Sequence, residues 1–326
     1  MIVCCGEALI DMIRADFPGR GEGFLPLPGG SPYNTAVAIG RLGVPAAFLG
    51  RLSRDFFGAM LVDRLKANHV RTGLLTRSKE TTTLAFVRLE PGKEPEYLFY
   101  TQGSADRSLG PGDIPEKLPP GARCILFGSI AMTMEPVASA IESLIVREGS
   151  RGTDGPVISL DPNVRPFMIA HRDAYVTRFE SWLPSVTIAK ISSADFDYIY
   201  PGLGLEKSME RILHLGPRLA VTTLGPRGAL ALLRRDDGSI LRVKAPVVQV
   251  PVVDTIGAGD TFHGALLSWL EIHGKMSRPA IAALDETDLY GALFFANKAA
   301  SLVCAKQGAD PPTLAEIEAL ESGGEK

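Results

Sequence analysis

The stretch DTIGAGDTFHG, residues 254–264, indicates the fold more strongly than any other segment. Beyond its two glycines, apolar residues recur at helical spacing at Phe262, Ala265, Leu266, Trp269 and Leu270. The pattern predicts that GAGD forms the first turn of a buried helix, whose free N–H groups favour an anion. The alternative is a strand-to-helix elbow in which the glycines only relieve strain. Because Asp260 is itself an anion, its place inside an anion site needs an explanation.

Polar residues also accompany four apolar segments that are typical of strands. VISL leads to Asp161, Asn163 and Arg165; TIAKIS contains Lys190 and Ser192; LAVTTLG contains Thr223 and Gly225; VVQVPVV leads to Asp254. In an open parallel sheet, ligands bind beyond the carboxyl ends of the strands. Each cluster alone is equally well explained as a strand or helix cap, but the agreement of the four favours one shared crevice.

Strand and helix patterns alternate along the chain, which predicts an α/β protein with a mainly parallel central sheet. Strands are expected at 2–5, 124–128, 157–161, 187–192, 219–225, 228–235, 240–244 and 247–250, with a tight turn at 236–239. Helices are expected at 32–42, 55–68 and 289–305. Ser31 is expected to cap the first of them, Gly43 to end it, and Thr313 and Glu316 to form a capping box. The tail at 322–326 is expected to fray.

Two insertions interrupt this alternation. TTTLAFVRLE and EYLFY flank PGKEP, which predicts a hairpin within residues 82–100. ADFPGRGEGFLPLPGG, residues 15–30, is too rich in glycine and proline for a helix. We expect that the two insertions could pair into a small sheet outside the main one.

Composition narrows the class of protein. The 326 residues are 45% hydrophobic with a formal net charge of -3, which fits a globular, soluble protein and gives no field suited to nucleic acid. The four cysteines form no CxxC pair, which is typical of a reducing compartment. The N-terminus lacks the pattern of a signal peptide and no apolar run is long enough to span a membrane, so the cytoplasm is the expected location. Neither GxxxxGK[ST] nor a complete GxGxxG occurs, which argues against Walker-type NTPases and Rossmann dehydrogenases.

The longer motifs resemble those of one family. DTIGAGDTF and GGSPYNTAVAIGRLG resemble the two signatures of the ribokinase-like (PfkB) carbohydrate kinases, and TTTLAFVRLE, FYTQGSAD, GSIAM, DPNVRP and TLGPRGA resemble its fructokinase branch. The resemblance implies a single domain, 1–326, folded as a three-layer α/β/α sandwich with a small β lid at about 12–28 and 82–106. It also implies transfer of the ATP γ-phosphoryl group to a primary hydroxyl of a ketose, with Mg²⁺ and in some members K⁺. Fructose is the leading candidate for this ketose.

The resemblance offers a reason for the position of Asp260. A sugar hydroxyl must lose its proton as the phosphoryl group arrives, and a carboxylate within hydrogen-bond reach can accept it. By resemblance Asp260 is this base, while the N–H groups of Gly257, Ala258 and Gly259 stabilise the charge on the transferring phosphoryl oxygens.

Other roles carry over at matching positions. Sugar contacts are implied for Asp11, Gly30, Ser31, Asn34, Phe99 and Arg165, although a surface ion pair would equally explain Arg165. ATP contacts are implied for Lys190, Ser192, Thr223, Gly225 and Gly228. Asp195 matches a residue that organises Mg²⁺ through water, and Asp254, Ile256 and Gly308 match a monovalent cation site. His263 is expected to be a packing neighbour without a functional role.

Two departures from the family pattern bear on the substrate. Ser192 and Asp195 replace Asn and Glu in the KxNxxE segment, and Thr101 stands where the family has an arginine on the lid strand. Without that arginine an acidic sugar loses its best partner, unless Arg88 or Arg107 replaces it, so a neutral ketose is expected. The alternatives are a 2-keto-3-deoxygluconate kinase, a ribokinase or nucleoside kinase, and a sugar-responsive regulator without activity. Pairing of two lids into a homodimer is a further expectation.

Overall fold

The computed structural model describes residues 1–88 and 96–322 and contains two sheets. The larger has the order β14-β13-β12-β11-β10-β9-β1-β4-β5, with β6 also paired to β4. Its strands are β1 (Ile2–Cys5), β4 (Ala46–Ser53), β5 (Val70–Arg71), β6 (Leu75–Ser78), β9 (Cys124–Gly128), β10 (Val157–Asp161), β11 (Ile188–Ser192), β12 (Leu219–Thr223), β13 (Ala229–Arg234) and β14 (Ile240–Ala245). All pair in parallel except β12–β13 and β13–β14, which confirms the mainly parallel sheet.

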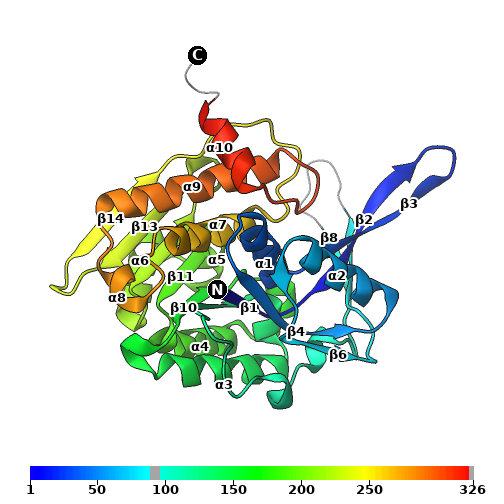
Figure 1. Ribbon diagram of the computed structural model, residues 1–326, viewed down its shortest axis with the longest axis horizontal. Helices are drawn as coiled ribbons and strands as arrows, with labels where there is room; N and C mark the ends of the chain where they lie inside the picture. The colour runs from blue at the N-terminus through cyan, green and yellow to red at the C-terminus, as the bar shows by residue number, and fades with distance from the viewer. Residues whose placement is uncertain (89–95, 323–326) are drawn as a thin grey trace.

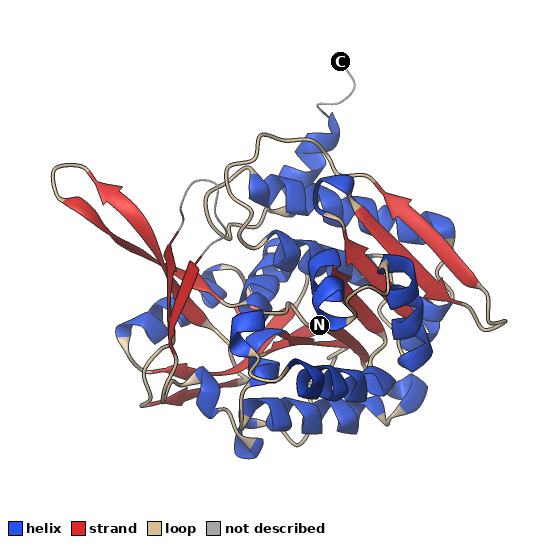
Figure 2. Cartoon of the chain, turned by 180° about the vertical axis from the view of Figure 1, so that it is seen from behind, coloured by secondary structure: helices blue, strands red, loops and turns tan. Residues whose placement is uncertain are grey.

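Helices cover both faces of this sheet (Figures 1 and 2). They are α1 (Ser31–Arg41), α2 (Phe56–Ala67), α3 (Val137–Gly149), α4 (Arg172–Trp182), α5 (Ser193–Ile199), α6 (Leu205–Leu215), α7 (Ala258–Ile272), α8 (Arg278–Ala282), α9 (Glu286–Cys304) and α10 (Leu314–Ser322). Side chains alternate along β1: Ile2 and Cys4 pack into the core with α1, α7 and α9, whereas Val3 and Cys5 pack into the core with α3 to α6. The sheet is therefore buried on both faces, as parallel sheets require.

Two local predictions are wrong. Ser31 does not cap α1: Gly30 is the N-cap, at φ 106, and Ser31 is the first helical residue. Residues 247–250 form no strand, although they are apolar and follow β14. These residues line a cavity instead. Their apolar side chains contribute to its wall, so their composition does not require pairing with a strand. The capping box of Thr313 and Glu316 is present, with 3.3 Å between Glu316 N and Thr313 Oγ1.

The second sheet has the order β3-β2-β7-β8, from β2 (Leu9–Phe17), β3 (Gly21–Gly29), β7 (Leu84–Arg88) and β8 (Glu96–Tyr100). The pairing of β2 with β7 confirms that the two insertions share a sheet outside the main one. The β2–β3 hairpin projects from the body (Figure 1). The predicted PGKEP turn and the fraying of residues 323–326 fall outside the described residues.

The second sheet is joined to the body at a small polar cluster. Asp106 accepts hydrogen bonds from Thr83, which precedes β7, and from Ser104, which follows β8, at 2.5 and 2.7 Å. Since all three are buried, these bonds fix the base of the sheet relative to the body. None of the helices within residues 1–88 and 96–322 combines the length and the apolar character needed to cross a membrane.

Candidate active site

The predicted anion site lies at the start of α7. Gly257 is the N-cap residue in the left-handed conformation, at φ 75, and a Cβ on it would lie 2.7 Å from the Cβ of Ala309. Only glycine fits both the dihedral angle and this close contact. Of the three predicted donors, Ala258 uses its N–H within the turn, bonded to the carbonyl of Thr255 at 3.2 Å. Among the described residues, no carbonyl accepts the N–H of Gly257 or Gly259, so these two remain free for an anion.

Asp260 follows in the first turn of α7, with 8% of its surface exposed. Its Oδ1 accepts a hydrogen bond from Ser31 Oγ at 2.6 Å, and its Oδ2 accepts one from Asn34 Nδ2 at 3.0 Å. Burial raises the pKa of Asp260 above its ordinary value, while these two hydrogen bonds act in the opposite direction. Helix α1 therefore orients the carboxylate and offsets part of the effect of burial on its pKa.

A polar cavity of about 330 Å³ opens beside Asp260. All six residues predicted to contact sugar line it, namely Asp11, Gly30, Ser31, Asn34, Phe99 and Arg165. Asp11 lies on β2, against Gly29 of the neighbouring β3, where any side chain would overlap its carboxylate. Burial, and next the charge of Asp260, raises the pKa of Asp11 to about 7, against the effect of Arg165. The two carboxylates thus face one space.

Arg165 and Phe99 form another part of the wall. Arg165 Nη1 donates to Asn163 Oδ1 at 2.8 Å, and Asn163 also lines the cavity. No ion pair of Arg165 is found among the described residues, so its surroundings do not match the alternative of a surface ion pair. The ring of Phe99 packs against Phe167 with 5.5 Å between centroids and adds an apolar part to the cavity wall.

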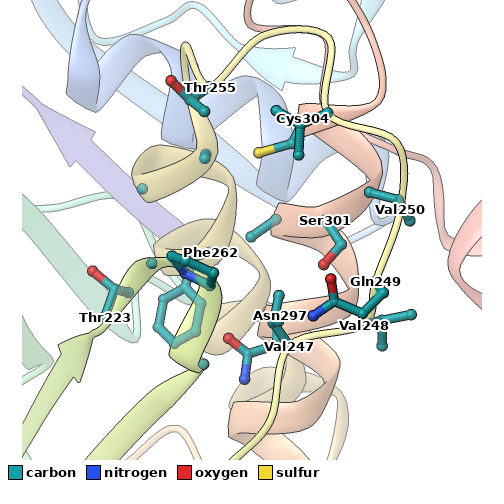
Figure 3. A pocket seen from close by; sticks show the side chains of 17 residues that line it. Thr223, Val247, Val248, Gln249, Val250, Thr255, Phe262, Asn297, Ser301 and Cys304 are labelled. Atoms are coloured by element: carbon teal, nitrogen blue, oxygen red, sulfur yellow. The ribbon is translucent and has the colours of Figure 1, made fainter.

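A second cavity, of about 450 Å³, lies on the other side of the α7 N-terminus and is mostly apolar. Figure 3 shows Thr223 and Phe262 on one side and residues 247–250 and α9 on the other. Thr223, Gly225 and Gly228, predicted to contact ATP, line it, and no atom lies within 4 Å of a Cβ built on Gly225. Thr255 and Gly259 line both cavities, so the two meet at the predicted anion site. An apolar space beside free N–H groups suits a nucleotide base with its phosphates at the helix end.

The match to known proteins agrees with this geometry. Residues 1–316 match the pfkB family carbohydrate kinases. The chain belongs to this family. A fructokinase from Rhizobium leguminosarum bv. trifolii is 36% identical over 293 residues, covering 89% of this chain and 85% of that protein.

Two solved structures extend the family match. Xylella fastidiosa fructokinase with bound ATP has a TM-score of 0.88 at 28% identity and covers 100% of this chain and 99% of that one. Vibrio cholerae O395 fructokinase with fructose, ADP and calcium has a TM-score of 0.82 at 27% identity, covering 98% and 97%. This PfkB kinase is thus an ATP-dependent sugar kinase with the predicted three-layer α/β/α fold.

Lys190 and Ser192, also predicted to contact ATP, line neither cavity of this PfkB kinase. Lys190 is buried and paired with Asp161, with 2.8 Å between Nζ and Oδ2. Burial lowers the pKa of the lysine, but the carboxylates around it outweigh burial and the pKa is raised. A Cβ on Gly259 would lie 3.2 Å from Lys190 Nζ, so the ammonium lies directly beneath the first turn of α7.

Asp195, the predicted Mg²⁺ organiser, acts as a helix cap in the structure. With Ser192 it forms the capping box of α5, and its Oδ1 accepts the N–H of Val164 at 2.9 Å. The carboxylate lines neither cavity, because its oxygens face backbone groups. Each oxygen of the carboxylate thus accepts one backbone N–H, and the role of Asp195 toward Mg²⁺ stays a prediction.

The residues predicted for a monovalent cation do come together. Asp254 Oδ1 accepts the N–H of Ile256 at 3.0 Å, and Asp254 Oδ2 accepts the N–H of Gly308 at 2.9 Å. One carboxylate thus joins the loop before α7 to the loop after α9. Both Asp254 and Ile256 line the polar cavity.

Glu7 and Asn297 are among the site residues that were not predicted. Glu7 is buried after β1 and accepts the N–H of Ser31 at 3.1 Å and of Ala131 at 3.2 Å; burial raises its pKa to about 7. Its place directly after a strand is the same signal that indicated the four other clusters. Asn297 lines the apolar cavity from α9, and its Nδ2 donates to the carbonyls of Ala245 and Pro246 at 3.1 and 2.9 Å. A buried amide in an apolar helix could have indicated it.

His263 is a buried neighbour, as predicted. Its Nε2 lies 2.7 Å from Ser159 Oγ and its Nδ1 lies 3.7 Å from Asp161 Oδ2, with no exposed surface. Burial lowers its pKa, which favours the neutral ring. The histidine therefore belongs to the core beneath the site.

Proposed function

We propose that this chain phosphorylates fructose at a primary hydroxyl, with ATP as the donor. The arrangement that carries the proposal is Asp260 in the wall of the polar cavity, next in the chain to Gly259, which lines both cavities, and close to the free N–H groups of Gly257 and Gly259. The relatives named above are fructokinases, and one was solved with fructose and ADP bound.

In the proposed reaction, Asp260 accepts the proton of the sugar hydroxyl. The sugar oxygen bonds to the γ-phosphorus of ATP, and the bond between the γ-phosphorus and ADP breaks. The N–H groups of Gly257 and Gly259 stabilise the charge on the phosphoryl oxygens. One such donor is worth about 3 kcal/mol of barrier in other enzymes. Lys190, buried beneath the same helix turn, adds a positive charge close to this point.

The metal ions are also part of the proposal. Mg²⁺ would neutralise phosphate charge, and we assign it to the ATP phosphates rather than to Asp195, whose oxygens bind backbone groups. Among the described residues no group of three or more His, Cys, Asp or Glu side chains could hold a metal ion, which fits a metal that arrives with the nucleotide. Carbonyl groups near Asp254 and Gly308 would hold a monovalent cation such as K⁺.

The charges around the polar cavity favour a neutral sugar over 2-keto-3-deoxygluconate. Four carboxylates line it, from Glu7, Asp11, Asp254 and Asp260, against the single guanidinium of Arg165. Arg107, a candidate replacement for the missing lid arginine, donates to Thr101 Oγ1 at 2.8 Å and does not line the cavity. The side chain of Arg88, the other candidate, falls outside the described residues.

We further propose that residues 1–326 act as one domain and that β2, β3, β7 and β8 form a lid over the sugar. Exposed Phe24 and Tyr100 both pack on Phe86, with ring centroids 4.9 and 5.6 Å away, so one face of the lid is apolar. Such a face could pair with a second copy. Light scattering should detect a dimer that Tyr100→Glu weakens.

We assign the protein to the cytoplasm, where ATP is supplied and free Cys4, Cys5 and Cys124 remain reduced.

The test is a coupled assay of ADP release with fructose, tagatose, ribose, adenosine and 2-keto-3-deoxygluconate. We expect fructose to give the highest kcat/KM. If another substrate gave a higher kcat/KM, that compound would be assigned as the substrate in place of fructose. Sugar binding seen by calorimetry, without ADP release on any substrate, would instead indicate a sugar-responsive regulator.

A further inference from the structure

The hydroxyl of Ser31 occupies the catalytic carboxylate before any sugar arrives. Ser31 Oγ donates to Asp260 Oδ1 at 2.6 Å, and both residues line the polar cavity. This distance is the one at which a general base holds the alcohol that it deprotonates. The serine hydroxyl thus has the chemistry and the distance expected of the acceptor alcohol.

The position of Ser31 is fixed on several sides. Its N–H donates to Glu7 Oε1 at 3.1 Å, and its carbonyl accepts a hydrogen bond from Thr35 Oγ1 at 3.0 Å. The next residue, Pro32, packs closely on Gly6, where a Cβ would lie 2.6 Å from Pro32 Cγ. Because the backbone around Ser31 is held, we expect rotation of the Ser31 side chain, rather than movement of its backbone, to release Asp260.

A phosphotransferase with a water-filled sugar site risks hydrolysing ATP, since water can replace the alcohol. Water oxygen would then bond to the γ-phosphorus, the bond to ADP would break, and Asp260 would take the proton, giving ADP and phosphate. Gly257 and Gly259 line the same cavity and would stabilise this reaction as they do the transfer to sugar. What limits the reaction is access of water to the carboxylate.

We propose that Ser31 suppresses ATP hydrolysis in the absence of sugar by occupying the acceptor position at Asp260. Asn34 donates to the other carboxylate oxygen, Oδ2, at 3.0 Å, so each oxygen of Asp260 already accepts a hydrogen bond from α1. An arriving sugar hydroxyl replaces the Ser31 hydroxyl there and restores transfer. This inference rests on the proposed kinase function.

The test compares sugar-independent ATP hydrolysis with sugar-dependent ADP release for the full chain and three variants. We expect Ser31→Ala to raise the ratio of hydrolysis to transfer by about tenfold or more, because water fills the position of the lost hydroxyl. Ser31→Thr keeps the hydroxyl and should keep the ratio near that of the wild type. Ser181→Ala removes an exposed hydroxyl of α4, far from the cavity, and its ratio should follow the wild type.

Residual sugar-dependent activity of Ser31→Ala shows that the variant folds, and adding Asp260→Asn to it should abolish the hydrolysis. A ratio for Ser31→Ala within twofold of the wild type would overturn the inference. So would phosphate found on Ser31 by mass spectrometry of wild-type protein incubated with ATP, because a hydroxyl that accepts phosphate does not protect ATP. Absence of any sugar-dependent ADP release from the wild type would instead count against the proposed function.

Discussion

The two cavities that meet at the start of α7 are built in different ways. The polar cavity is lined by carboxylates, two amides and a guanidinium, several of which are fixed by hydrogen bonds. The apolar cavity is lined by glycines, by Phe262 and by residues 247–250, which form no strand. Sugar recognition should therefore depend on the placement of single charges, and nucleotide recognition on shape and backbone. Substitution of a single side chain should therefore reduce activity severely in the polar cavity and moderately in the apolar cavity.

The largest expected effect is that of Asp260→Asn. Because the amide cannot accept the sugar proton, we expect kcat to fall about 10²- to 10⁴-fold, with sugar affinity retained. Steady-state kinetics and calorimetry measure the two quantities. The control is Asp237→Asn, which removes an exposed carboxylate from the β13–β14 turn. Turnover within a few-fold of the wild type would remove Asp260 from the mechanism.

Gly257→Ala should come next. An alanine there combines an unfavourable φ of 75 with a Cβ 2.7 Å from Ala309, which displaces the free N–H groups of Gly257 and Gly259 beside the polar cavity. We expect kcat to fall about 10²-fold or more. Gly238→Ala is the matched control, since it has a similar φ of 84 but open space around the new Cβ. Equal losses in the two variants would mean that backbone strain alone explains the result.

A third effect concerns pH and Glu7. Burial raises its pKa from 4.5 to about 7, so the folded protein holds this proton more tightly than the unfolded chain does. Protonated Glu7 makes its full contribution to the free energy of unfolding below pH 4.5. This contribution, on the order of 3 kcal/mol, is lost as the pH rises to about 7 and above. Between pH 5 and 8, the Tm of the wild type should therefore fall relative to the Tm of Glu7→Gln. A constant difference would show that the Glu7 pKa is not raised.

On the nucleotide side, Asn297→Ala should have a moderate effect. The change removes two hydrogen bonds that hold the carbonyls of Ala245 and Pro246, each worth about 1 kcal/mol. We expect KM for ATP to rise about tenfold and kcat to change little. A fall in kcat with unchanged KM would contradict the contrast between the two cavities.

The smallest effect is expected for Asp195→Ala. Since the carboxylate caps α5, its loss should lower the free energy of unfolding by about 1 kcal/mol. The Mg²⁺ concentration that gives half-maximal activity should stay the same. A large shift in that concentration would return Asp195 to the metal site.

The contrast also explains what the sequence could predict. Asn34 and Asp260 lie in long motifs that resemble those of the family, and Asp11 stands at a matching position, so all three could be assigned from the sequence and line the polar cavity. Ser31 was expected to cap a helix because the sequence does not reveal its contact with Asp260, 229 positions away. The burial of Lys190 beneath Gly259 is likewise a tertiary contact. Residues 247–250 have the composition of a strand, but they line a cavity.

The most direct test of the central claim is a single-turnover measurement on Asp260→Asn saturated with fructose and ATP. If this carboxylate takes the proton as the phosphoryl group moves, formation of the sugar phosphate should slow about 10²-fold or more while the Kd for fructose stays within a few-fold of the wild type. Transfer at the wild-type rate in the bound complex would contradict the account.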